Sequence, residues 1–274
     1  MRKSKIKTKL AEGKPVLLTM LNTIDPSLFE LTSLFGLDGI WLDLEHNNPS
    51  LETVSTLLRA ARVGSADVLV RLAKGEFMRM GRVLEAGASG IMYARCDDAA
   101  EAREVVRWCK FGPLGKRGFC GGNADMPYCT MKLPDYIQQA NEQTFVVIQV
   151  EDPQAVDNAF EIAQVPGVDV LFFGPADFSI ASGCPGQFDH PKSQQAIETV
   201  ADAARKAHIH WGSISTSLDH TKRLLESGAS LISYLSDTVI FKKHLQCIQK
   251  QFEPLGFDFD SQLVSIDDSY LEME

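Results

Sequence analysis

Residues 39–46 read Gly39-Ile40-Trp41-Leu42-Asp43-Leu44-Glu45-His46, an apolar run that closes on two carboxylates and an imidazole. The run has the length of a buried strand, and Asn48-Pro49-Ser50 after it is typical of a helix start. An unpaired buried charge costs several kcal/mol, so ionisable residues at a strand end need a partner or a task. Two interpretations stand at this point: a polar loop that caps the next helix, or a histidine held as a general base.

The same rhythm of short apolar run and amphipathic segment repeats along the chain. Runs that are apolar throughout are typical of parallel strands covered on both faces. Eight such units in 274 residues predict a (β/α)8 TIM barrel, an α/β fold of one domain. No G-x-G-x-x-G follows the first strand, which disfavours a dinucleotide-binding sheet. The expected strands are 16–21, 40–44, 68–72, 90–94, 145–150, 170–173, 211–214 and 231–235, and the clearest helices are 50–63, 98–110, 191–208, 217–227 and 238–252.

Two segments depart from this rhythm. Residues 111–143, rich in Gly, Pro, Asn and Cys, lengthen the connection after the fourth strand. Long insertions in compact domains are usually functional, so we expect a lid or an oligomer contact here. Residues 253–274 carry many Asp and Glu. We therefore predict a barrel domain over 1–252 and an acidic, peripheral C-terminal extension over 253–274.

Composition excludes several classes of protein. The net charge is −9 and no basic cluster interleaves with aromatic residues, which argues against nucleic acid as a partner. No secretory leader pattern and no apolar stretch of about 18 residues is present, so we expect a cytoplasmic protein without a membrane partner. The six cysteines show no C-x-x-C spacing and are predicted to be free thiols. Cys96, at a strand end, lacks an obvious activating base.

Chemistry in such barrels lies at the carboxyl ends of the strands. Glu151 and Asp177 end neighbouring strands, and two carboxylates without cysteine suit a hard divalent cation such as Mg²⁺ or Mn²⁺. The alternative is that both only cap the helices that follow. Arg71 within an apolar strand requires an anion, either Glu45 or a bound substrate.

This set of residue types fits chemistry on a 2-oxo acid. A metal would chelate the carboxylate and carbonyl oxygens and stabilise an enolate as a Lewis acid. Arg71 would stabilise the same developing charge, and His46 would move a proton at the neighbouring carbon or hydroxyl.

Several motifs occur in the order seen in one enzyme family. The chain resembles the class II, metal-dependent pyruvate aldolases of the HpcH/HpaI type over roughly residues 5–252, and the Gly-Pro-Ala-Asp-Phe-Ser stretch one βα unit after Gln-Val-Glu is the most specific part. The motifs are Asp43-x-Glu45-His46, Val70-Arg71, Leu84-Glu85-Ala86-Gly87, Phe111-Gly112-Pro113-x-Gly115-x-Arg117-Gly118, Gln149-Val150-Glu151 and 174–179.

The resemblance implies a role for each matching position. Glu151 and Asp177 would bind a divalent metal (Mg²⁺, Mn²⁺ or Co²⁺), Arg71 would stabilise the pyruvate enolate, and His46 would be the acid/base at the aldol hydroxyl. Gln149 and the backbone of Ala176 and Asp177 would contact the substrate. Family members commonly assemble as trimers of dimers, which implies a homo-oligomer.

The sequence departs from the family pattern near the mouth of the barrel. The carboxylate that raises the basicity of the histidine is commonly Asp; Glu85 stands at that position, and Asp43 is a second candidate. The Tyr-Pro-Pro-x-Gly-x-Arg-Gly loop of the family is Phe-Gly-Pro-Leu-Gly-Lys-Arg-Gly here, and Tyr93-Ala94 replaces Val-Pro. These changes bear on the aldehyde partner more than on the pyruvate half-site.

The expected function is retro-aldol cleavage of a 4-hydroxy-2-oxo acid to pyruvate and an aldehyde, without a Schiff-base lysine. Two alternatives remain. An acyl-CoA lyase of the citramalyl/malyl type would need a basic, adenine-sized pocket, of which the sequence gives no clear sign. A non-catalytic barrel that binds 2-oxo acids would show no enolisation.

Overall fold

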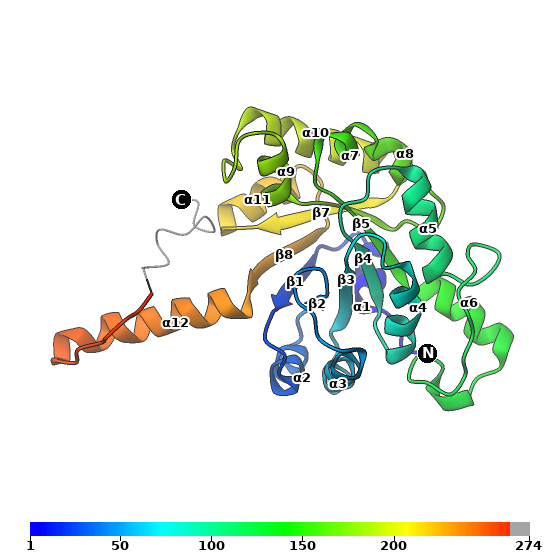
Figure 1. Cartoon of the computed structure of the whole chain (residues 1–274), viewed down its shortest axis with the longest axis horizontal. Coiled ribbons are helices and arrows are strands. Elements are labelled where there is room, and N and C mark those ends of the chain that lie inside the picture. Colours follow the sequence, from blue (N-terminus) through cyan, green and yellow to red (C-terminus); the bar gives the residue numbers. More distant parts are fainter. Residues whose placement is uncertain (264–274) are drawn as a thin grey trace.

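Eight parallel strands close into a barrel in the computed structural model, which describes residues 1–263 (Figure 1). Each strand pairs with its sequence neighbours, and β8 pairs with β1 to close the barrel. The predicted TIM barrel is therefore confirmed, and three of the expected strands have the observed bounds. The strands are β1 (Val16–Leu21), β2 (Gly39–Asp43), β3 (Asp67–Leu72), β4 (Gly90–Tyr93), β5 (Phe145–Val150), β6 (Val170–Phe173), β7 (His210–Ser215) and β8 (Leu231–Ser236).

Helices surround the barrel, and side chains at their first residues explain several starts. Asp98 accepts hydrogen bonds from the backbone N–H groups of Ala100 and Glu101, and Ser50 and Ser217 cap their helices in the same way. The α-helices are α1 (Lys5–Ala11), α2 (Pro26–Leu34), α3 (Leu51–Ala61), α4 (Phe77–Ala86), α5 (Ala99–Cys109), α6 (Leu133–Gln143), α7 (Pro153–Asp157), α8 (Ala159–Ala163), α9 (Pro175–Ala181), α10 (Pro191–Ala207), α11 (Leu218–Glu226) and α12 (Asp237–Phe252), with short 3₁₀ turns η1 (Pro127–Cys129) and η2 (Glu253–Leu255).

The apolar strand residues divide between two layers because successive side chains alternate across a strand. Trp41, Leu69, Phe145 and Phe172 fill the barrel interior. Their neighbours along the same strands pack outward against the helices in a larger cluster.

The insertion at residues 111–143 lies at the end of the barrel opposite the mouth. It follows α5, so it leads into the amino end of β5 and not out of the carboxyl end of β4. Ser4, which caps the amino-terminal helix α1, donates its backbone N–H to Gln143 Oε1 and its hydroxyl to Asp67 at the start of β3. The expectation of a lid over the mouth is wrong because the extra residues follow a helix. An oligomer contact stays a prediction.

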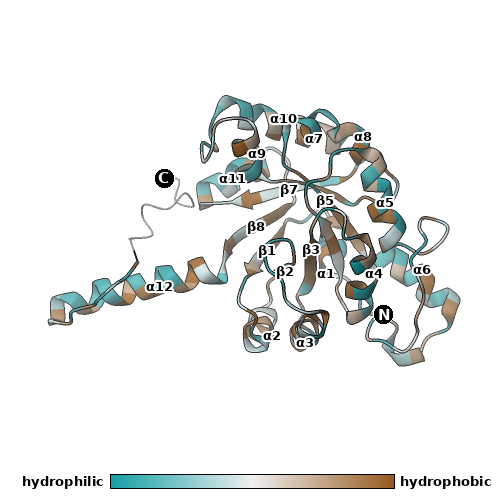
Figure 2. Cartoon of the chain, in the orientation of Figure 1, coloured by the Kyte–Doolittle hydropathy of each residue, from teal (hydrophilic) through white to brown (hydrophobic). Residues whose placement is uncertain are grey.

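Helix α12 projects from the barrel as an arm (Figure 1). Figure 2 shows hydrophobic and hydrophilic residues alternating along it. Phe241 is 65% exposed, and four other large apolar side chains of the helix are also exposed: Ile240, Leu245, Ile248 and Phe252. Residues 264–274 of the predicted acidic extension lie outside the described residues, and the boundary at 252/253 stays a prediction.

Candidate active site

An ion pair across neighbouring strands anchors the mouth of the barrel. Asp43 on β2 and Arg71 on β3 are register partners, and Arg71 Nε lies 2.7 Å from Asp43 Oδ1. Both side chains are buried, and the guanidinium stacks 4.8 Å from the ring centroid of Trp41. Burial disfavours the charged carboxylate, but the hydrogen bond and charge of Arg71 outweigh it and lower the pKa of Asp43. The strand register thus supplies the anion that the buried arginine requires.

Glu45 connects the guanidinium to His46. Its Oε2 atom lies 3.0 Å from Arg71 Nη1 and 3.7 Å from His46 Nε2. The same oxygen is buried and makes no hydrogen bond, because the arginine approaches outside hydrogen-bond geometry. Burial raises the pKa of Glu45 despite the nearby guanidinium of Arg71. His46 is 64% exposed, so its imidazole stands at the entrance.

Neither carboxylate that the sequence suggested for His46 meets its imidazole within this chain. Asp43 accepts the backbone N–H of His46 (3.3 Å) and is otherwise committed to Arg71 and the N–H of Glu45. Glu85 lies in the last turn of α4, which leads into the amino end of β4, whereas His46 follows the carboxyl end of β2. Within this chain Glu85 and His46 therefore lie at opposite ends of the barrel, and the pairing of Glu85 with His46 stays a prediction. A role for Glu85 at His46 would require a neighbouring subunit.

Glu151 forms the buried part of the acidic site. Its side chain accepts hydrogen bonds from the amide of Gln149 (2.5 Å) and from the backbone N–H of Arg95 (2.7 Å). Gly174 makes room for this arrangement: a Cβ there would lie 2.6 Å from Glu151 Oε2. Gln149 Oε1 remains buried without a partner, which leaves an acceptor for a ligand.

Asp177 lies in the first turn of α9, next to Ala176. Its Oδ1 atom is 3.5 Å from Nη1 of Arg95, and both side chains are partly exposed. Reasoning from the sequence missed Arg95, which lies two residues after the end of β4. The signal in the sequence that could have identified it is an arginine at the end of the apolar run 90–94.

The acidic site carries more negative than positive charge. Four carboxylates (Asp43, Glu45, Glu151 and Asp177) face two guanidinium groups (Arg71 and Arg95). Burial, together with the charges of Glu45 and Asp177, raises the pKa of Glu151 to about 7. The excess reaches two negative charges only when Glu45 and Glu151 are both ionised, and a divalent cation would neutralise it.

The donor set fits a hard cation that keeps open positions. Among residues 1–263 no group of three or more His, Cys, Asp and Glu side chains is arranged to hold a metal. Glu151 and Asp177 offer two carboxylates, and Mg²⁺ typically takes one or two and fills its other positions with water and substrate oxygens. These residues therefore fit a cation shared with a substrate better than a closed structural site.

A cavity of about 380 Å³ adjoins the acidic site. Trp41 and Ala176 line it, which connects it to Arg71 and Asp177. The indole N–H of Trp41 is buried without a partner. The far wall is apolar and hydroxyl-rich and includes Ile214, Ser215, Thr216, Ser233, Ser236 and Lys242. The mouth thus combines an acidic half with a mostly neutral half.

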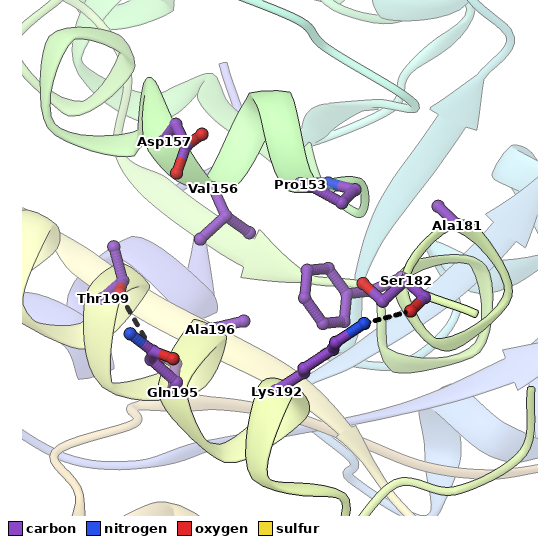
Figure 3. Close-up of a pocket in the computed structure, with 10 residues that line it drawn as sticks. Pro153, Val156, Asp157, Ala181, Ser182, Lys192, Gln195, Ala196 and Thr199 are labelled. Atoms are coloured by element: carbon purple, nitrogen blue, oxygen red, sulfur yellow. Dashed lines mark hydrogen bonds between the residues drawn. The ribbon is translucent and has the colours of Figure 1, made fainter. Parts of the chain in front are cut away.

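A separate groove of about 410 Å³ lies on the outer surface between α7, α9 and α10 (Figure 3). Its lysine, Lys192, donates to the carbonyl oxygen of Ser182, as Figure 3 shows. Lys192 points to Ser182 and Asp157 lies apart from it in Figure 3, so the groove does not bring an acid and a base together.

All six cysteines are free thiols, as predicted. Burial raises the pKa of Cys96 to about 12, which removes it as a nucleophile. Within residues 1–263, every helix is too short or too polar to cross a bilayer.

Comparison with known proteins places the chain in a family. The family model described as HpcH/HpaI aldolase/citrate lyase matches residues 18–243. A 4-hydroxy-2-oxo-heptane-1,7-dioate aldolase of Shigella sonnei is 31% identical over 246 residues, covering 90% of this chain and 94% of the relative. The chain belongs to the HpcH/HpaI aldolase/citrate lyase family. It is accordingly an enzyme of the carbon–carbon lyase class.

Solved structures agree with this assignment. An HpcH/HpaI aldolase from Desulfitobacterium hafniense superimposes with a TM-score of 0.86 at 29% identity, covering 92% of this chain and 98% of that one. The citrate synthase SbnG superimposes with a TM-score of 0.83 over 91% of this chain and 98% of its own. At 24% identity the second likeness supports the fold alone.

Proposed function

We propose that this enzyme is a class II aldolase that cleaves a 4-hydroxy-2-oxo acid to pyruvate and an aldehyde. The observation that carries the proposal is the acidic site, in which Glu151 and Asp177 adjoin the buried Arg71 and the exposed His46. The family and the aldolase names of its relatives support the same reaction class.

The residues divide the reaction between them. His46, at the entrance, takes the proton of the C4 hydroxyl as the C3–C4 bond breaks and the aldehyde forms. The electron pair of that bond passes to the C2 oxygen, where the guanidinium of Arg71 stabilises the enolate charge. Glu45 lies between the two groups, with its Oε2 3.0 Å from Arg71 Nη1 and 3.7 Å from His46 Nε2. The proton taken up by His46 is then delivered, directly or through a water, to C3, which gives pyruvate.

Glu151 and Asp177 would hold the divalent cation, Mg²⁺, Mn²⁺ or Co²⁺. When bound, this cation supplies Lewis-acid stabilisation of the charge on the 2-oxo group. The unpaired Oε1 of Gln149 would accept from an O–H of the substrate or of a bound water, and the start of α9 at Ala176 and Asp177 would position the oxo acid. Gly174 keeps the carboxylate of Glu151 in line with Gln149.

The direct test is metal dependence. EDTA should abolish pyruvate release from 4-hydroxy-2-oxo acids, and Mg²⁺, Mn²⁺ or Co²⁺ should restore it. Activity that survives EDTA, or trapping of a substrate adduct by borohydride, would refute the proposal. A panel of aldehydes with pyruvate and metal, read by product mass, identifies the acceptor. Binding of coenzyme A in calorimetry would favour the acyl-CoA lyase, and absence of deuterium exchange into pyruvate would favour the non-catalytic barrel.

We also propose a cytoplasmic homo-oligomer. The exposed apolar side chains of α12 support this proposal, because an apolar surface of this extent usually marks an interface. Solution mass measurements decide the stoichiometry.

A further inference from the structure

We propose that the guanidinium of Arg95 is an internal counter-ion that competes with the divalent cation for Asp177 and so sets the affinity for the metal. The inference rests on the proposed function, because it concerns the same two carboxylates. It makes Arg95 a positioning residue of the metal site.

The backbone of Arg95 is fixed on both sides. Its N–H donates to Glu151 Oε1 at 2.7 Å, and its carbonyl oxygen accepts from Lys74 Nζ at 2.8 Å. Lys74 is itself held by Asp97 and Glu101. The backbone N–H and the backbone carbonyl of Arg95 therefore both form hydrogen bonds, which place the residue beside Glu151 and Asp177.

The backbone conformation of Arg95 is one that residues other than glycine rarely adopt. Its φ is 54°, in the left-handed region. Residues held in that region persist where the surroundings impose them, often at functional sites. Here the imposed conformation lies two residues after the end of β4 and brings the guanidinium to Asp177.

The side chain can leave this position readily. Arg95 Nη1 lies 3.5 Å from Asp177 Oδ1, a distance typical of a loose ion pair, and the side chain is 53% exposed. Arg71, in contrast, is buried and tied to Asp43 at 2.7 Å. Of the two guanidinium groups in the acidic site, only that of Arg95 has access to solvent and a weak partner.

A cation held by Glu151 and Asp177 would be repelled by a guanidinium on the same carboxylate. The metal-free enzyme therefore keeps Asp177 partly neutralised by Arg95, and the arriving cation displaces the arginine toward solvent. The peptide N–H of Arg95 continues to orient Glu151 in both states. The arginine side chain then weakens metal binding while its backbone supports it.

The test is metal affinity of the full chain, measured by Mn²⁺ calorimetry at low ionic strength. Arg95→Met removes the charge, and Arg95→Asn removes it with a residue that tolerates positive φ. Both variants should bind Mn²⁺ roughly three- to tenfold more tightly than wild type, and Arg95→Lys should stay within about twofold of wild type. Arg205→Met is the matched control, since it removes a guanidinium paired with Asp202 on the outer helix α10.

Two different outcomes would overturn the inference, and only the second would also refute the proposed function. Unchanged or weaker Mn²⁺ affinity in both uncharged variants, with wild type binding metal and releasing pyruvate, would refute the role of Arg95 alone. Absence of Mn²⁺ binding to wild type would refute the proposed function and this inference with it.

Discussion

Arg71 Nε and Asp43 Oδ1 lie 2.7 Å apart in the buried mouth of the barrel, on residues that the β2–β3 register places side by side. The pair explains how an apolar strand accommodates a permanent charge. It also fixes the direction of the guanidinium, whose Nη1 atom reaches Glu45.

Arg71→Lys should reduce kcat/KM for pyruvate release by about 10²-fold or more. A lysine keeps the charge but cannot contact Asp43 and a developing oxyanion with one planar group. Steady-state assays with saturating metal measure the effect. Arg107→Lys, in an exposed pair with Glu104, is the control; equal rates for Arg71→Lys and wild type would contradict the assigned role.

Asp43→Asn should lower the free energy of unfolding by about 3 kcal/mol, because it leaves the buried guanidinium without its charged partner. Since the pKa of Asp43 is lowered in the folded state, its contribution is present above the ordinary value of about 3.9 and is lost as pH falls through the folded value. Urea unfolding at pH 7 and at pH 3.5 should therefore show a smaller difference at the lower pH. A constant difference would count against the ion pair.

Glu151→Gln should abolish tight metal binding and change the pH dependence of stability. The pKa of Glu151 rises from 4.5 to about 7 on folding, so the folded state holds the extra proton between these values. The metal-free protein should therefore lose up to about 3 kcal/mol of stability through this group as pH rises from 4.5 to 7. The variant should lack that loss in urea unfolding.

Added metal provides the complementary measurement for Glu151. Because protons and the cation compete for the same carboxylate, Mn²⁺ affinity of wild type should rise with pH up to about 7 and then level off. Affinity that is independent of pH between 5 and 8 would contradict a ligand role for this residue.

His46→Gln should reduce kcat by about 10²- to 10⁴-fold while leaving Mn²⁺ affinity close to wild type, because the imidazole moves a proton and does not hold the cation. Calorimetry and initial rates on the same preparation separate the two functions. His244→Gln, an exposed histidine on α12, controls for loss of an imidazole elsewhere. Loss of metal binding in His46→Gln would require a different assignment.

Phe241→Asp combined with Ile248→Asp should produce a smaller species than wild type in light scattering. Both apolar side chains are exposed on α12, and a charge would be costly at a buried interface. Ile180→Asp, which changes one exposed apolar residue on α9, is the control. Unchanged mass in the double variant would exclude α12 from the oligomer contact.

The sequence by itself determined the barrel and most of its acidic site. Apolar runs of strand length, separated by amphipathic segments, are a local pattern, and parallel strands bring their carboxyl ends to one rim. For that reason Asp43, Arg71, Glu151 and Asp177 could be assigned to the same mouth before any contact was known.

The tertiary structure decided the pairings. Which carboxylate meets His46 depends on side-chain direction and on the end of the barrel, so Glu45 and not Glu85 or Asp43 lies beside the imidazole within this chain. The insertion at 111–143 follows a helix and therefore cannot cover the mouth. The contact between Arg95 and Asp177 was found only in the structure. It depends on the positive φ of Arg95 and on its two backbone hydrogen bonds, which spacing along the chain does not encode.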